Sequence, residues 1–145
     1  MTARTFVDTN VLVYAEDLDA GPRHDKARLV VEGLWETGLG VVSVQVLQEF
    51  FSIVTRKLPR TIPPYRARAI IAQYLHWETV ENSGALLLSA IDVQVRHRLS
   101  FWDAMVVQAA VQSGAAVLLS EDFGNGRVIE GVRIENPFAT GSERG

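Results

Sequence analysis

The sequence predicts an α/β fold with a mainly parallel central sheet of four to five strands. Short apolar segments alternate with longer segments of helical pattern along the whole chain, which is typical of strands joined by crossover helices. The segment "AAVLLS" at residues 115–120 is continuous, apolar and short, as expected of a strand buried on both faces. There is no linker, internal repeat or low-complexity stretch, and 145 residues suit one compact domain. The expected domain therefore covers residues 1–145.

The first half of the chain holds two of the expected strands. "RTFV" at residues 4–7 is the first strand, and residues 10–16 form a short helix. The next helix has Pro22 near its start and Gly38 at its end, which are common boundary residues. "GVVS" at residues 40–43 is the second strand. Ser43 then caps a long helix that reaches Leu58.

The second half begins with a break at "PRTIPP", residues 59–64. The segments that follow are a helix over 65–75, a strand within 76–82 ("HWETVEN"), a helix over 83–98, a helix that "SFWD" opens and Gly114 stops, the strand 115–120, a turn at 124–126 and a last strand from Val132. The tail over residues 140–145 is expected to be frayed.

Composition excludes several classes of protein. Hydrophobic residues make up 48% and charged residues 21%, which indicates a globular chain rather than a disordered one. The chain has no cysteine, so disulfides, zinc–thiolate sites and cysteine catalysis are excluded. No apolar stretch reaches the ~18 residues of a membrane span, and no secretory leader precedes the first strand. We therefore expect a cytoplasmic protein with no membrane contact.

The net charge of −3 argues against a general nucleic-acid binder, which usually has a basic excess. It leaves open an enzyme with an acidic site and basic residues around its rim. Such basic groups occur at Arg56, Lys57 and Arg60 and at Arg96 and Arg98. Each group either meets phosphates or is a solvated helix end, and the second interpretation is favoured.

Acidic residues follow two of the predicted strands. Asp8 ends the first strand, and Ser120, Glu121 and Asp122 end the strand "AAVLLS". In an open parallel sheet, sites form at the carboxyl ends of the strands. These side chains are therefore expected at one edge of the sheet.

Two further acids lie on helices. Asp103 is at the start of a helix, directly after "SFW". Glu49 lies just beyond Ile53, at the margin of the apolar arc of its helix, when residues are spaced by about 100°. Glu49 can therefore point along the sheet edge toward Asp8.

Converging carboxylates repel one another. A pair ~4 Å apart repels by roughly 4 kcal/mol at an effective dielectric near 20. Such a cluster either has raised pKa values or holds a cation. Oxygen ligands without Cys or His favour Mg²⁺ or Mn²⁺, and the three histidines show no ligand spacing.

Each acid also has a purely structural interpretation. Asp103 would cap its helix, Asp122 would be a turn residue, and Glu49 would be a solvated helix acid near Arg56. A buried Asp8 needs partners, and capping explains only part of its placement. Thr9 and Asn10 can cap the short helix and also orient that carboxylate.

Four segments of the sequence, taken together, resemble a known family. The segments "FVDTNVLVYA", "SVQVLQEFF", "SFWDAMVVQAA" and "LLSEDF" are similar, in order, to the motifs of the PIN domain, and most of all to the VapC-type toxin ribonucleases of bacterial toxin–antitoxin systems. The resemblance runs from Thr5 to about Phe138. It implies a three-layer sandwich. It also implies that Asp8, Glu49, Asp103 and Asp122 are catalytic and bind metal, with Glu121 as the alternative for the last acid, and that Thr9, Asn10, Ser120 and Glu121 support them.

The resemblance implies Mg²⁺- or Mn²⁺-dependent hydrolysis of phosphodiester bonds in single-stranded RNA by an activated water, leaving a 5′-phosphate. It implies a cognate antitoxin as partner, with a helix that lies in an apolar groove. The helices over 43–58 and 65–75 carry more apolar residues than one face of a small sheet can bury. We expect this surplus to serve the antitoxin and a homodimer. The residues concerned are Phe50, Phe51, Ile70, Ile71 and Tyr74.

Three other interpretations compete with this one. A phospho-acceptor receiver domain needs a lysine at a late strand end, and both Lys26 and Lys57 lie on early helices. A dinucleotide-binding domain needs a glycine-rich first turn, and here that turn is "DTN". A third possibility, a PIN-like module that binds metal or protein without catalysis, stays open.

Trp102, beside Asp103, is either a packed aromatic residue, which is favoured, or a ring that stacks on a base.

Overall fold

The computed structural model describes residues 3–139, so the predicted frayed tail at 140–145 lies outside the described residues. A six-stranded sheet with the order β3-β2-β1-β4-β6-β5 forms the centre of the fold. Its strands are β1 (Thr5–Val7), β2 (Gly40–Ser43), β3 (Glu78–Val80), β4 (Val117–Leu119), β5 (Val128–Ile129) and β6 (Val132–Glu135). All neighbouring strands are parallel except β5 and β6. The predicted mainly parallel α/β sheet is confirmed.

The sheet has six strands rather than the predicted four to five, because β5 was not foreseen. This strand has two residues and forms a hairpin with β6. The turn residues Glu130 and Gly131 both have positive φ, 51° and 82°, as a type I′ turn requires. Two residues are too few to show the alternation by which a strand is recognised in a sequence.

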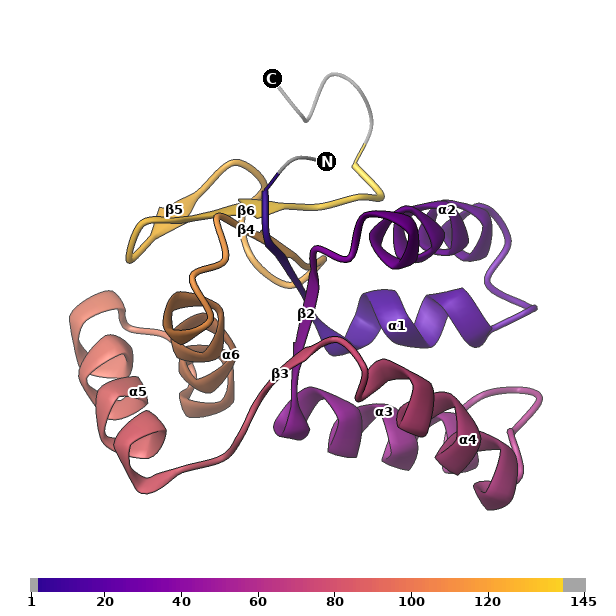
Figure 1. The fold of residues 1–145 in the computed structure, drawn as a ribbon. Coiled ribbons are helices and arrows are strands. Elements are labelled where there is room, and N and C mark those ends of the chain that lie inside the picture. The colour runs from indigo at the N-terminus through magenta and orange to yellow at the C-terminus, as the bar shows by residue number, and fades with distance from the viewer. Residues whose placement is uncertain (1–2, 140–145) are drawn as a thin grey trace.

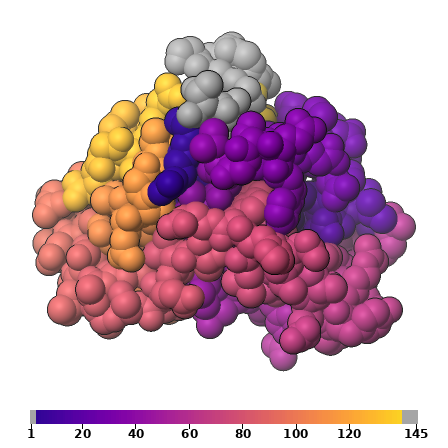
Figure 2. Space-filling model, viewed as in Figure 1, coloured from indigo at the N-terminus to yellow at the C-terminus, as the bar shows by residue number. Residues whose placement is uncertain are grey.

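Six helices surround the sheet on both sides, which gives three layers (Figure 1). They are α1 (Thr9–Glu16), α2 (Pro22–Thr37), α3 (Val44–Arg56), α4 (Pro64–Tyr74), α5 (Gly84–His97) and α6 (Phe101–Gln112). Figure 1 shows α5 and α6 together on one side, and α1 and α2 on the other. On the face drawn in Figure 2, the residues from α4 through β3 to α5 form a continuous band across the lower half.

The helix boundaries follow from local chemistry. Ser43 caps α3 by accepting a hydrogen bond from the backbone N–H of Val46 at 3.2 Å, and Ser83 caps α5 in the same way. Pro22 begins α2, and Gly38 ends it in the left-handed conformation that glycine adopts without strain. These predicted boundaries are confirmed, although several strands are shorter at their ends than the apolar runs suggested.

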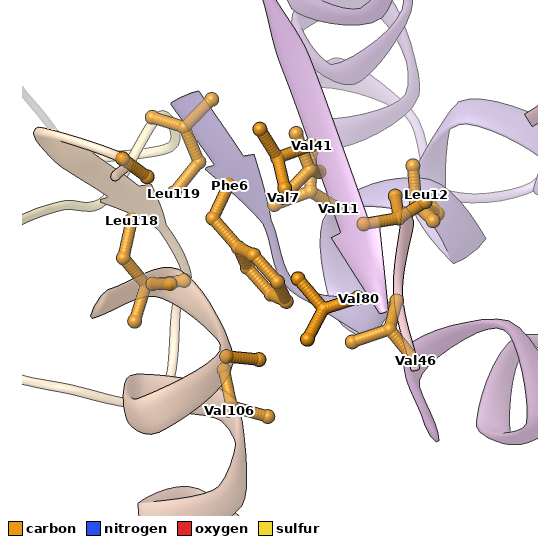
Figure 3. Packing of buried hydrophobic residues seen from close by; sticks show 14 of the residues in the cluster. Phe6, Val7, Val11, Leu12, Val41, Val46, Val80, Val106, Leu118 and Leu119 are labelled. Atoms are coloured by element: carbon orange, nitrogen blue, oxygen red, sulfur yellow. The ribbon is translucent and has the colours of Figure 1, made fainter. Parts of the chain in front are cut away.

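The core lies on both faces of β1. Phe6 points toward Val106 of α6, whereas Val7 lies on the other side, near Val11 of α1 (Figure 3). Both β1 residues are fully buried. Neighbouring side chains of a strand alternate between faces, so β1 holds the two helical layers together through the middle of the sheet. No helix within residues 3–139 is long and apolar enough to cross a membrane.

Candidate active site

Asp8 occupies the junction between β1 and α1, at the carboxyl end of a central strand. Its backbone N–H donates to the carbonyl of Leu119 in β4, which continues the strand pairing to this residue. Its carboxylate caps α1 by accepting from the backbone N–H of Thr9 at 2.7 Å. The other oxygen accepts from the Ser120 hydroxyl, also at 2.7 Å. Both oxygens of a side chain that is only 5% exposed are therefore held in place.

The environment of Asp8 disfavours its charge. Burial raises the pKa of this carboxyl to about 6, and the hydrogen bonds from Ser120 and Thr9 offset part of that effect. The nearby carboxylates of Asp122 and Glu49 make smaller contributions in the same direction as burial, and the value of about 6 includes them. Burial therefore causes most of this shift, and repulsion between the converging acids contributes the smaller part. A cation placed here would remove the penalty.

Glu49 points from α3 toward the same strand end. Its carboxylate accepts from the Thr9 hydroxyl at 2.9 Å and from the side-chain amide of Gln45 at 3.1 Å. Thr9 thus touches Asp8 through its backbone and Glu49 through its side chain. The interpretation of Glu49 as a solvated acid near Arg56 was wrong, since within residues 3–139 no ion pair joins the two.

The segment after β4 brings Asp122 to the site. The side-chain amide of Asn10 donates to Asp122 at 3.0 Å, and the backbone N–H of Asp122 donates to the Ser120 hydroxyl at 3.1 Å. Ser120 therefore connects Asp122 with Asp8. Asn10 and Ser120 make the contacts expected of supporting groups.

Glu121 points elsewhere. It accepts from the Tyr14 hydroxyl at 2.9 Å and pairs with Nε of Arg23 at 2.7 Å. Burial, followed by the bond to Glu121, raises the pKa of Tyr14. Of the two alternatives for the fourth acid, Asp122 lines the cavity described next, and Glu121 does not.

Asp103 is not the cap of its helix, so that interpretation was wrong. Ser100 is the N-cap of α6, and its hydroxyl accepts from the backbone N–H of Asp103 at 3.1 Å. The half-buried side chain of Asp103 is thereby left to face the cavity. The cap residue was visible in the sequence as Ser100, three positions earlier.

A cavity of about 320 Å³ collects these groups. All four predicted acids line it, together with Asp17, which sequence reasoning missed. Asp17 ends α1, the helix that Asp8 begins, and that shared helix was the available signal. None of the described residues that line the cavity is Lys, Arg or His.

The donor set suits a hydrated divalent ion. Within residues 3–139, no three Asp, Glu, His or Cys side chains are grouped closely enough to hold an ion by themselves. Mg²⁺, however, is usually held by one or two carboxylates and several waters. The five carboxylates of the cavity, whose described lining includes no Lys, Arg or His, offer the one or two ligands that this mode of binding needs.

Two of the basic residues that could contact phosphates form ion pairs with acidic residues of the protein. Arg60 makes two hydrogen bonds to Asp19, and Arg96 pairs with Glu130. Trp102 is 61% exposed and lines the cavity, so the favoured interpretation of a packed aromatic was wrong.

Comparison with solved structures finds the same fold in toxin proteins. The sarcin–ricin-loop-cleaving toxin VapC20 of Mycobacterium tuberculosis is 23% identical, with a TM-score of 0.64 over 89% of this chain and 98% of that one. A toxin–antitoxin complex from Klebsiella pneumoniae is 15% identical, with a TM-score of 0.68 over 94% and 99%. VapBC2 of Rickettsia felis, bound to a DNA fragment from its promoter, is 18% identical, with a TM-score of 0.65 over 91% and 97%.

No match was found among curated proteins. The family comparison is decisive, because the PIN domain matches residues 5–128, which include all the acids of the cavity. The ordered motifs, the three-layer parallel fold and the acidic cavity at the strand ends agree with that match. The chain belongs to the PIN domain family.

Proposed function

We propose that this protein is a single-domain, cytoplasmic endoribonuclease that hydrolyses phosphodiester bonds in single-stranded RNA with the help of Mg²⁺ or Mn²⁺, and that it is the toxin of a toxin–antitoxin pair. Membership of the PIN family and the likeness to VapC toxins support a toxin ribonuclease. The observation that carries the proposal is the cavity with five carboxylates, no lining cation and a buried Asp8 whose pKa is raised to about 6.

Asp8, Glu49, Asp103 and Asp122 are proposed to hold the metal, directly or through water. A bound divalent ion would supply a more acidic water and neutralise charge on the phosphate. The protein's own groups prepare this site. Ser120 and the backbone of Thr9 fix both oxygens of Asp8, and Gln45 and the Thr9 hydroxyl fix Glu49.

No protein nucleophile is needed for this reaction. Water displaces the 3′ oxygen from phosphorus, and the products are a 3′-hydroxyl and a 5′-phosphate. Each carboxylate of the cavity can orient the water or take up its proton by hydrogen bonding. Asp8 suits the second role poorly, because both of its oxygens already accept hydrogen bonds.

An apolar groove between α3 and α4 supports an antitoxin partner. It encloses about 520 Å³ and is lined by Val44, Leu47, Gln48, Phe51, Ile71 and Leu75. Of the predicted surplus, Phe50 and Tyr74 belong to the core, whereas Phe51 is exposed in the groove. A concave apolar surface of this kind accepts the apolar face of a helix from another chain.

The test is cleavage of mixed RNA by the purified protein. We expect cleavage with Mg²⁺ or Mn²⁺, none in EDTA, and none by Asp8→Asn in either metal. Melting curves of both proteins with and without Mn²⁺ report metal binding independently of activity, because a bound ligand raises the melting temperature. Cleavage that persists in EDTA would contradict the metal mechanism. Metal-dependent stabilisation without any cleavage would instead indicate a non-catalytic PIN-like module.

A further inference from the structure

Trp102 is the most exposed tryptophan of the chain, and it lines the acidic cavity. Its side chain is 61% exposed, although burial of a large aromatic ring is strongly favourable. The other two tryptophans pack against each other with ring centroids 5.1 Å apart, and both also contact Tyr74. Trp102 has one aromatic neighbour, Phe101, at 4.9 Å. Most of the Trp102 ring therefore has no partner within the described chain.

The backbone that carries this ring is held in place. Trp102 lies in the first turn of α6, between the cap Ser100 and the cavity acid Asp103. Its carbonyl accepts from the side-chain amide of Gln45 at 3.4 Å, and Gln45 also donates to Glu49. Trp102 thus directly precedes one proposed metal-holding acid in the chain, and its backbone is connected through Gln45 to another.

The wall of the cavity has two chemical characters. Carboxylates and apolar side chains both line it, together with the polar residues Thr9, Asn10, Tyr14 and Gln45. The apolar members are Val13, Ile53, Leu58, Trp102 and Val106. A nucleotide has the same two characters, since its phosphate binds metal and its base has an apolar face.

Among the described residues, the lining lacks the basic residues that usually bind nucleic acid, and base stacking would supply affinity without them. Nucleic-acid binding usually depends on Lys and Arg contacts to phosphate, and none of the described lining residues is basic. Stacking of a base on an aromatic ring contributes affinity without cations and tolerates any base. Stacking would therefore allow an acidic protein with a net charge of −3 to retain RNA at its site.

We propose that Trp102 is the stacking platform for an unpaired base of the RNA, in a nucleotide next to the phosphate that is cleaved. The proposal rests on the ribonuclease function proposed above. It also gives that function a physical reason to select single strands, because a base inside a duplex presents no free face to the ring.

The experiment measures RNA binding by W102F, W102L and W102A. Ca²⁺ replaces Mg²⁺, as another cation that prefers oxygen ligands, and the integrity of the RNA is checked after each titration. The probes are a mixed-sequence single-stranded RNA octamer, the same pool as a duplex, and octamers with one abasic site at successive positions. W35F is the matched control, because Trp35 is 40% exposed but does not line the cavity.

We expect the single strand to quench tryptophan emission in the wild type and in W35F, but not in W102F. W102F should bind nearly as well as the wild type, because it keeps a ring. W102L keeps apolar bulk without a ring, and it should bind about tenfold more weakly, as should W102A, within the range for the loss of one stacked base. One abasic position should weaken wild-type binding by a similar factor and leave W102L unaffected.

The outcomes separate this proposal from the ribonuclease function. Equal RNA affinity of the wild type and W102L, with equal kcat/KM for cleavage, would overturn the platform and leave the ribonuclease intact. Quenching of Trp102 by RNA that is never cleaved in Mg²⁺ or Mn²⁺ would support the platform and overturn the ribonuclease. If W102L lost only the binding of a protein partner, the ring would serve that partner, and the platform would be overturned.

Discussion

Asp8 is the only buried carboxylate among the five acids that line the cavity. Burial raises its pKa to about 6, compared with about 3.9 for an unfolded aspartate. In the metal-free protein above pH 6, the folded state therefore has to hold a charge that its surroundings disfavour. A cation bound as proposed above would offset this loss of stability.

Asp8→Asn should therefore stabilise the metal-free protein at pH 8, by about 1–3 kcal/mol in the free energy of unfolding. Asparagine caps a helix about as well as aspartate, so α1 keeps its cap. Urea denaturation in EDTA measures the change. Asp103→Asn is the matched control, because Asp103 is half-buried and is not among the groups that raise the pKa of Asp8. Equal gains in the two variants would contradict burial as the cause.

The same pKa predicts how this gain depends on pH. Between about pH 4 and 6 the folded protein keeps a proton on Asp8 that the unfolded chain releases. Raising the pH through this window therefore destabilises the wild type relative to Asp8→Asn. The difference between the two proteins should be small at pH 4 and reach its full size above pH 6. A difference that did not change from pH 4 to 8 would refute the assignment.

At the scale of elements, the loop after β4 is tied to α1 and α2 by Glu121. This residue binds Tyr14 and Arg23, and the Arg23 guanidinium lies 5.8 Å from the ring centroids of Tyr14 and Phe138. Asp122 follows directly in the chain. We therefore expect this cluster, together with Asn10 and Ser120, to position Asp122 relative to Asp8.

Glu121→Gln should lower cleavage about tenfold or more while changing stability by less than about 1 kcal/mol, because misplacing a reacting group is costly and an exposed ion pair is not. Arg23→Gln should have a similar effect, since it breaks the same pair. Arg60→Gln is the control, because it breaks an exposed pair with Asp19 away from this loop. Steady-state cleavage rates measure the effect on activity, and urea denaturation measures the effect on stability. Full activity in both cluster variants would show that Asp122 is placed without this cluster.

The start of β2 depends on a glycine. A Cβ atom at Gly40 would lie 2.6 Å from Cε3 of Trp77, a buried ring that cannot move aside without disturbing the core. Gly40→Ala should destabilise the protein by about 1–3 kcal/mol through this overlap. Gly33→Ala, inside α2 with open space around it, should instead stabilise by about 0.5–1 kcal/mol. Thermal melts of the two variants should therefore shift in opposite directions.

At the scale of the whole molecule, two apolar surfaces of different shape lie outside the core. One is the concave groove of α3 and α4. The other is a row along one side of α5, formed by the exposed residues Leu87, Leu88, Ile91 and Val95. A convex helical row can pack against its own copy about a two-fold axis, whereas a groove needs a protruding partner. The shapes suit the row to a homodimer and the groove to an antitoxin.

We expect light scattering to show a dimer at micromolar concentration and Leu88→Asp to yield a monomer with a normal circular dichroism spectrum, because the new charge would be buried in the interface. Leu29→Asp changes an equally exposed leucine on α2 and should leave the dimer intact. A wild type that stays monomeric across this range of concentration would contradict the dimer.

The sequence by itself determined the features that depend on neighbouring residues. The alternation of apolar strands with helices predicted the parallel sheet, and Pro22, Gly38, Ser43 and Ser83 marked helix ends correctly. The acids at the carboxyl ends of β1 and β4 were found because the two strands are parallel neighbours. These signals are local, since hydrogen-bond geometry and side-chain periodicity act within a few residues.

Only the tertiary structure decided the features that depend on contacts between distant residues. The bond from Asn10 to Asp122 spans 112 positions, as does the bond from Ser120 to Asp8. Such contacts placed Asp122 in the cavity and turned Glu121 toward Arg23, although the two acids are neighbours in the chain. Asp17, in contrast, reaches the cavity through the helix that it shares with Asp8. The direction of a side chain is set by what surrounds it in three dimensions, and a sequence pattern contains only its order along the chain.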